Sequence, residues 1–215
     1  TVYLYNDNGA IKQVNYFQKK PQQQELSPSY SDIPEYQENR VERINRFDEN
    51  NSLVGFTSFL YNTDGKVVNM HQVSYDKESF AVVSYGTAAG FNNIVIDYAL
   101  DNGNVVNYNM RFRKGNMIDD GSTSSTGAGG HGVYTYDFNI NPYIHLKLPD
   151  FFLRNMSKNN LVDEQKTYAG SLPSAEPYKF EYSYDVEGYP VELVKSYKSY
   201  TTGEHLYKTR TVYTY

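Results

Sequence analysis

Apolar and polar residues alternate along much of this chain with a period of two. The alternation is clearest over residues 94–100, 106–113 and 178–185. In the second segment the apolar positions hold valine, tyrosine, methionine and phenylalanine, and the positions between them hold asparagine or arginine. A period of two over seven or eight residues predicts β-strands with one buried and one wet face.

A short motif recurs between such segments. It consists of an aromatic residue, an Asp or Asn, two further residues, a Gly, and an apolar residue two positions later. Asp and Asn side chains bond nearby backbone amides, and Gly adopts positive φ, so the motif predicts tight hairpins. In one copy Asn51 stands where the others have Gly, because Asn also enters the left-handed region. The copies span residues 5–11, 47–53, 61–67, 100–105 and 184–191.

Three segments depart from this pattern. Residues 19–39 are polar and contain three prolines, which predicts a long surface loop. Residues 115–132 are rich in Gly, Ser and Thr, which is typical of a flexible linker. Pro149 and Asp150 precede a short apolar run, which predicts one short helix over residues 149–156.

The motif occurs on both sides of every interruption, which favours a single β domain over residues 1–215. We therefore predict an all-β fold: a strongly curved antiparallel meander or barrel-like sheet of consecutive hairpins. Ordinary strand and turn lengths give roughly 10–14 strands for a chain of this size.

Composition limits the possible functions. The 215 residues carry a formal net charge of -5, which argues against nucleic-acid binding because that needs a basic face. Cysteine is absent, so the chain can hold neither disulfides nor thiolate metal sites. There are 23 tyrosines and no tryptophan. Sheet propensity explains this surplus, and a face that binds sugars or peptides is the sharper alternative.

No apolar run approaches the ~18 residues of a membrane helix. A membrane-spanning barrel is the alternative, but its aromatic residues would gather at the two rims of the strands. Here tyrosine occurs throughout the strands, which favours a water-exposed sheet and no membrane span. Residues 1–5 already have the pattern of a strand, so we expect that an export signal has been removed.

Catalytic and metal-binding motifs do not stand out. None of the four histidines has a second histidine at metal-ligand spacing, so no metal and no cofactor is predicted. The chain lacks a Gly-x-Ser-x-Gly nucleophile elbow. The run at 119–121 starts like a calcium loop but lacks its later ligands. No catalytic residue is predicted.

One polar cluster is the strongest candidate for binding. Arg111 and Arg113 share a strand face that leads into the Gly-rich segment. Asp119, Asp120 and His131 lie close by in the sequence and complete the set of candidate binding residues. An ordinary solvated face beside a linker explains the same residues and is the favoured interpretation.

Two resemblances add to this reading. The repeated hairpins look like the YD repeats of bacterial surface shells and toxins. Residues 134–137, 141–143, 157–160 and 182–190 together resemble an uncharacterised family of cell-envelope lipoproteins from gut Gram-negative bacteria. That family is described as a domain of unknown function with a porin-like fold. The resemblance implies a curled sheet, export and a lipid on an N-terminal cysteine, which this chain lacks, and it supplies no catalytic residues.

The leading hypothesis is a noncatalytic extracytoplasmic binding or scaffold domain, periplasmic or at the cell surface. Its candidate ligands are a glycan, a lipid or an envelope protein. The alternative is a carboxylate-based hydrolase of envelope or dietary polysaccharide, which requires two carboxylates converging in a cleft.

Overall fold

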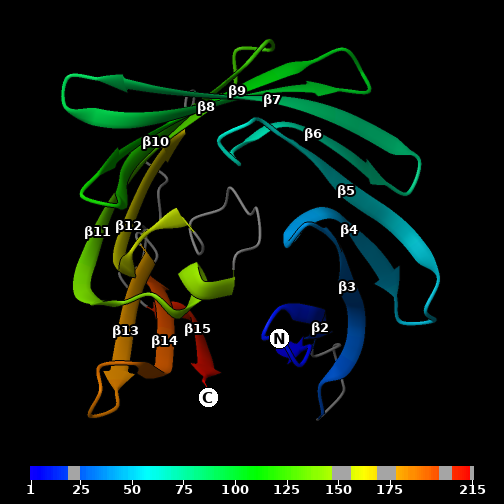
Figure 1. Cartoon of the computed structure of the whole chain (residues 1–215). Coiled ribbons are helices and arrows are strands. Elements are labelled where there is room, and N and C mark those ends of the chain that lie inside the picture. Colours follow the sequence, from blue (N-terminus) through cyan, green and yellow to red (C-terminus); the bar gives the residue numbers. More distant parts are fainter. Residues whose placement is uncertain (19–24, 147–155, 169–177, 199–204, 214–215) are drawn as a thin grey trace. The chain divides into compact units, whose positions relative to one another are not determined.

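The computed structural model describes residues 1–18, 25–146, 156–168, 178–198 and 205–213, which form an antiparallel meander (Figure 1). The described strands lie in the sheet in chain order from β1 to β15, without a crossover. The predicted all-β meander is confirmed. The strands are β1 (Val2–Tyr5), β2 (Ile11–Gln18), β3 (Ser27–Gln37), β4 (Arg40–Asp48), β5 (Leu53–Tyr61), β6 (Val67–Ser74), β7 (Lys77–Ala88), β8 (Phe91–Leu100), β9 (Val105–Arg113), β10 (Asn116–Ser124), β11 (Gly129–Ile140), β12 (Asn159–Tyr168), β13 (Tyr178–Tyr184), β14 (Pro190–Lys198) and β15 (His205–Val212).

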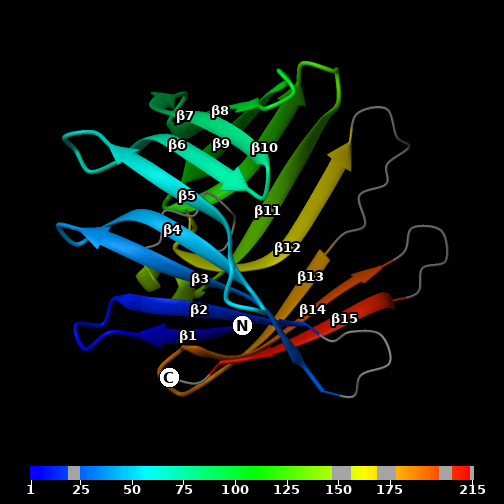
Figure 2. The ribbon, with the colours of Figure 1, turned by 90° about the vertical axis from the view of Figure 1, so that its right-hand side faces the viewer.

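The chain forms two compact units. Unit 1 comprises Thr1–Val83 and Tyr98–Gly103, and unit 2 comprises Ser84–Asp97 and Asn104–Tyr215. Figure 2 shows β1 to β5 of unit 1 as successive hairpins, coloured from blue to cyan.

Turn chemistry explains where the strands end. The Asn62 side-chain oxygen accepts hydrogen bonds from the amides of Asp64 and Lys66, both at 3.0 Å. Asp185 does the same for the amides of Glu187 and Tyr189, at 3.0 and 2.8 Å. These acidic and amide residues of the motif are therefore occupied by the turns. Positive φ occurs where the motif predicts it, at Gly9 (78°), Asn51 (63°), Gly65 (75°), Gly103 (78°) and Gly188 (87°).

Some tyrosines at shifts in the strand register donate hydrogen bonds to backbone carbonyls of other strands. Tyr61 follows a shift in the β5–β6 register, and its hydroxyl donates to the carbonyl of Val41 at 2.6 Å. Tyr36 follows a shift in the β3–β4 register and donates to the carbonyl of Ile11 at 2.9 Å. Both acceptors belong to buried residues. A bulge leaves ladder groups unpaired, so these hydroxyls have a structural role.

Each unit has its own apolar core. In unit 1, Phe59, Met70 and Ala81 are direct partners across β5, β6 and β7, and they define the core face of these strands. In unit 2, Met110 and Phe112 alternate along β9 with exposed arginines, as the period of two predicts. The buried apolar residues are Ile11, Val14, Val41, Phe59, Val67, Met70, Ala81 and Val83 in unit 1, and Ile96, Met110, Phe112, Met117 and Tyr134 in unit 2.

The predicted loop over residues 19–39 is wrong for its second half. Residues 27–37 form β3, which pairs with both β2 and β4. Pro28 stands beside a register shift, and Pro34 lies just before the shift between Glu35 and Tyr36. Proline is tolerated in sheets at such bulges, because the ladder bond it cannot donate is already interrupted there. Residues 19–24 lie outside the described part of the chain.

The predicted linker over residues 115–132 is also wrong. Its residues form β10, the turn at Gly127 and the start of β11. The glycines inside this hairpin serve close packing, because a Cβ on Gly129 would lie 2.6 Å from the carbonyl oxygen of Ser122. The composition suggested a flexible segment. In the structure its glycines instead allow the backbones of β10 and β11 to lie close together.

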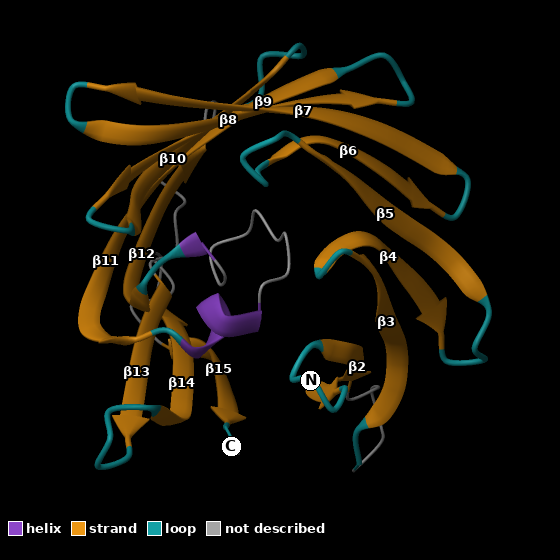
Figure 3. Ribbon diagram, in the orientation of Figure 1, coloured by secondary structure: helices purple, strands orange, loops and turns teal. Residues whose placement is uncertain are grey.

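The predicted helix over residues 149–156 lies outside the described residues, except for Met156. A short 3-10 helix, η1 (Pro142–Leu146), was not predicted and appears in purple in Figure 3. Asn141 caps it, since its side-chain oxygen accepts the amide of Tyr143 at 3.0 Å.

Candidate functional site

The five candidate binding residues lie on or beside β9, β10 and β11 of unit 2. Arg111 and Asp119 are direct partners across β9 and β10. Their two hydrogen bonds, Nε to Oδ1 and Nη2 to Oδ2, both measure 2.6 Å. The two parallel hydrogen bonds form a bidentate arginine–carboxylate pair, so the Arg111 guanidinium is bound to its partner on the neighbouring strand. The carboxylate beside Arg111 raises the pKa of its guanidinium.

Arg113 and His131 lie on the same face of the sheet as this pair. Arg113 is two residues from Arg111 on β9, and its guanidinium lies 5.9 Å from the ring centre of Phe91. His131 is the direct partner of Gly121, two positions along β10 from Asp119. This face is therefore polar and solvated.

Asp120 lies on the opposite, core face. It pairs with buried Met110 on one side and with Gly132 on the other. Consecutive strand residues point to opposite faces, so the adjacent carboxylates Asp119 and Asp120 are separated by the sheet itself. The structure thus divides the candidate cluster, and its role in binding stays a prediction.

Asp120 belongs instead to a group that we call the β10–β12 polar cluster: Asp120, Gly132, Tyr134, Glu164 and Lys166. Gly132 is the direct partner of Lys166, and Tyr134 is the direct partner of Glu164. Glu164 forms an ion pair with Lys166, and its side chain is only 5% exposed. Tyr134 is buried, and a Cβ on Gly132 would overlap both its hydroxyl and the Asp120 carboxylate.

Burial sets the ionisation of the tyrosines near this cluster. It raises the pKa of Tyr134 well above the ordinary range, and the neighbouring Asp120 adds to the effect. Burial also raises the pKa of Tyr136 to about 12, although the hydrogen bond from Ser157 acts in the opposite direction. Both phenols are therefore held in the neutral form, which suits a structural role.

A different arrangement crosses four strands of unit 1. We call Arg43, Phe56, His71 and Phe80 the aromatic row. The Arg43 guanidinium lies 3.7 Å from the ring centre of Phe56. The Phe56 ring meets His71 edge-on, with centres 5.3 Å apart, and His71 stacks on Phe80 at 4.4 Å with an interplanar angle of 6°.

The register places this row on the face opposite the core. His71 pairs directly with Ser58 of β5 and with Phe80 of β7, one residue away from the core partners Met70 and Ala81. Phe80 keeps 53% of its surface exposed. The row therefore ends on β7 in a ring that is exposed to solvent.

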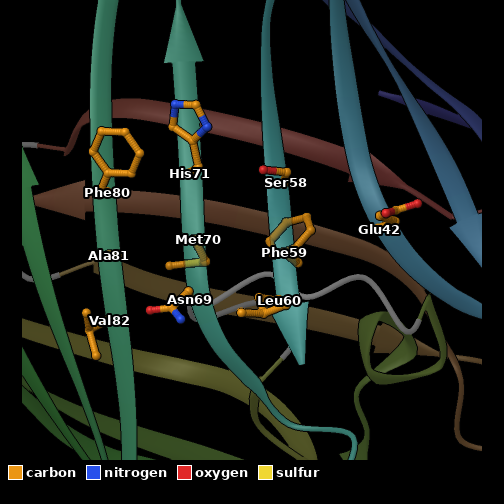
Figure 4. A pocket seen from close by; sticks show the side chains of 10 residues that line it. All are labelled: Glu42, Ser58, Phe59, Leu60, Asn69, Met70, His71, Phe80, Ala81 and Val82. Atoms are coloured by element: carbon orange, nitrogen blue, oxygen red, sulfur yellow. The ribbon is translucent and has the colours of Figure 1, made fainter. Parts of the chain in front are cut away.

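A hollow of about 380 Å³ adjoins the Phe80 end of the row (Figure 4). The Nε2 atom of His71 lies 3.8 Å from Oε1 of Glu78 and has no hydrogen-bond partner among the described residues. The hollow thus combines an exposed ring with polar groups, as small-ligand sites do. It is lined by Glu42, Ser58, Phe59, Leu60, Asn69, Met70, His71, Phe80, Ala81 and Val82.

The aromatic row was missed in the sequence, where its members are ordinary strand residues of four different strands. The signal that could have found it is the register imposed by the turns. The turn at Asp64-Gly65 fixes the pairing of Ser58 with His71, and the next turn fixes the pairing of His71 with Phe80.

No group of three or more His, Asp or Glu side chains that could hold a metal occurs among the described residues. In the same part of the chain, no helix is long and apolar enough to cross a membrane.

Comparison with known proteins supports the fold. No protein-family model matches the chain, and no curated protein matches it in sequence. A porin-like protein from Bacteroides uniformis ATCC 8492 is similar in structure, with a TM-score of 0.67 and 14% identity, over 99% of this chain and 88% of that protein. A porin-like protein from Bacteroides vulgatus ATCC 8482 is similar with a TM-score of 0.58 and 15% identity, over 98% of this chain and 92% of that protein. The chain therefore has the porin-like β fold of these Bacteroides proteins.

Proposed function

We propose that this chain is a noncatalytic binding domain of the bacterial cell envelope. The observation that carries the proposal is the aromatic row, which ends in the exposed ring of Phe80 beside a hollow. Large exposed rings with polar neighbours are the usual components of binding surfaces. The porin-like Bacteroides neighbours support an envelope location.

The resemblance to envelope lipoproteins supports the same location. This chain contains no cysteine. A lipid anchor of the kind that the resemblance implies would therefore need a cysteine outside these 215 residues.

A carboxylate-based hydrolase is the second candidate, and one pair of carboxylates supports it. Asp120 and Glu164 share the core face around Tyr134. Glycoside hydrolysis requires both carboxylates to reach the substrate. Glu164 is buried and ion-paired with Lys166, and Gly132 is overlaid by side chains, so the binding domain is the better supported function.

The test is a binding screen with the purified chain at high micromolar concentration. The probes are immobilised neutral oligosaccharides, peptidoglycan fragments, phosphatidylethanolamine–phosphatidylglycerol vesicles and purified envelope proteins. Retention of one class supports the proposal, and retention of none contradicts it. New reducing ends released from the oligosaccharides, and lost in Asp120→Asn, would favour the hydrolase instead.

A further inference from the structure

We propose that the hollow beside Phe80 and His71 binds a neutral sugar ring of a glycan. This inference rests on the proposed binding function and adds the ligand class and the residues that contact it. The geometry of the ring, the polar rim, and the size and charge of the hollow each support it.

The Phe80 ring is a platform held in place before any ligand arrives. His71 covers one side of it in a parallel stack at 4.4 Å, and Phe56 supports His71 edge-on. Arg43 in turn covers Phe56 at 3.7 Å. More than half of the Phe80 surface stays exposed. A ring fixed in this way loses little freedom on binding, which favours affinity.

A pyranose offers a complementary surface to such a ring. Its axial C–H bonds form an apolar patch with partial positive charge, and an aromatic face carries partial negative charge. Its hydroxyl groups, in contrast, need both donors and acceptors at the rim of the site. A sugar is therefore bound best where one ring lies next to several small polar side chains.

The hollow supplies those groups. Asn69 lies between Leu60 and Val82 in the register, so a donor and an acceptor stand among exposed apolar side chains. Glu42 and Ser58 add a carboxylate and a hydroxyl to the lining. His71 contributes the support of the Phe80 ring, because its Nε2 atom is shielded from solvent.

Size and charge disfavour the other ligand classes. A volume of about 380 Å³ is at the low end of the ~300–1,000 Å³ typical of ligand pockets, and suits one or two rings better than an acyl chain. Glu42 lines the hollow and Glu78 adjoins His71, which opposes anionic headgroups and phosphates. Asn69 interrupts the apolar surface that a protein partner would cover.

The experiment is a calorimetric or NMR titration of the whole chain with cellotetraose, xylotetraose, maltotetraose and chitotetraose. At least one is expected to bind the wild-type chain. Phe80→Ala should weaken this binding at least tenfold and Asn69→Ala severalfold. Phe80→Tyr should retain it, which separates loss of the platform from loss of folding. The matched control is Phe138→Ala on β11, since Phe138 is fully exposed and far along the chain from the row.

Two outcomes would overturn the inference. One is sugar binding that Phe80→Ala leaves unchanged in a folded variant. The other is that no tetrasaccharide binds while vesicles, peptidoglycan fragments or an envelope protein do. In that second case the proposed binding function stands without the sugar. If none of these probes binds, both proposals fail.

Discussion

The aromatic row of β4–β7 and the polar cluster of β10–β12 are built by the same rule and differ in what covers them. Both are rows of side chains from neighbouring strands that register brings together on one face. The row lies opposite the core and ends in a half-exposed ring. The cluster lies on the core face, where Tyr134 folds over Gly132 and closes the space.

The difference shows that charge alone is a poor guide to function in this sheet. The cluster contains two carboxylates and a lysine, yet its groups are engaged with one another. The row has a single stacked arginine and two phenylalanines, yet it leaves the ring of Phe80 more than half exposed. Accessibility, set by which face a residue occupies, separates the closed cluster from the row that we propose binds a ligand.

The largest expected effect is on the cluster. Gly132→Ala places a methyl group where the Tyr134 hydroxyl and the Asp120 carboxylate already lie. We expect unfolding free energy to fall by about 2–3 kcal/mol, the cost of overpacking a close-packed site. Urea unfolding followed by tyrosine fluorescence measures it. Gly86→Ala is the matched control, because a Cβ there meets nothing within 4 Å. Equal losses in the two variants would refute the closed cluster.

The next effect concerns the buried ion pair. Glu164→Gln leaves Lys166 without its carboxylate partner in a site that is mostly shielded from water. We expect a loss of about 1–2 kcal/mol, less than for a fully buried pair because Lys166 is one-third exposed. Glu181→Gln removes the equivalent partner of Lys179 on exposed β13 and should cost less than about 0.5 kcal/mol. A smaller loss for Glu164→Gln than for Glu181→Gln would contradict the comparison.

A third effect appears at alkaline pH. The folded pKa of Tyr136 is raised to about 12 from 10.0, so its stabilising contribution is complete below pH 10. Above pH 10 the unfolded chain loses this proton before the folded chain does. The free energy of unfolding therefore falls by about 1.4 kcal/mol per pH unit from this group, until the pH reaches the folded pKa of Tyr136. Thermal melts between pH 8 and 11.5 should show a shallower decline in Tyr136→Phe than in Tyr75→Phe, which alters an exposed turn tyrosine. The same decline in both would contradict burial as the cause.

The smallest effect on stability is expected from the row itself. Phe80→Ala removes a half-exposed ring that packs mainly on His71. We expect a loss of less than about 1.5 kcal/mol, since such ring pairs contribute about 0.5–1.5 kcal/mol. Thermal melts check this value. A loss equal to that of Gly132→Ala would make Phe80 a core residue and the row a structural element.

The sequence predicts the hairpins well because their chemistry is local. The motif predicts that Asn51 takes the place of a glycine, and its φ of 63° confirms this. The class of the fold followed from these turns and from the alternation between them. β3 was missed because its two prolines suggested a loop, and only the bulges beside them show why they are tolerated.

The candidate site was harder to predict because it depends on faces and register. Asp119 and Asp120 are neighbours in the chain, but consecutive strand residues point to opposite faces of the sheet, so each carboxylate lies with partners from other strands. His71 and Phe80 are nine positions apart in sequence, and only the pairing of β6 with β7 stacks them. Composition could not show either result.

The most direct test of the comparison is one NMR titration of the chain labelled with ¹³C in its phenylalanine rings. The most tightly bound tetrasaccharide is added, and each ring is assigned by substitution. The account predicts that the resonances of Phe80, and to a smaller extent Phe56, shift with saturation, while those of Phe112 in the core and Phe138 on β11 do not. Shifts confined to Phe112 or Phe138, or no shift of Phe80 when the sugar is bound, would contradict it.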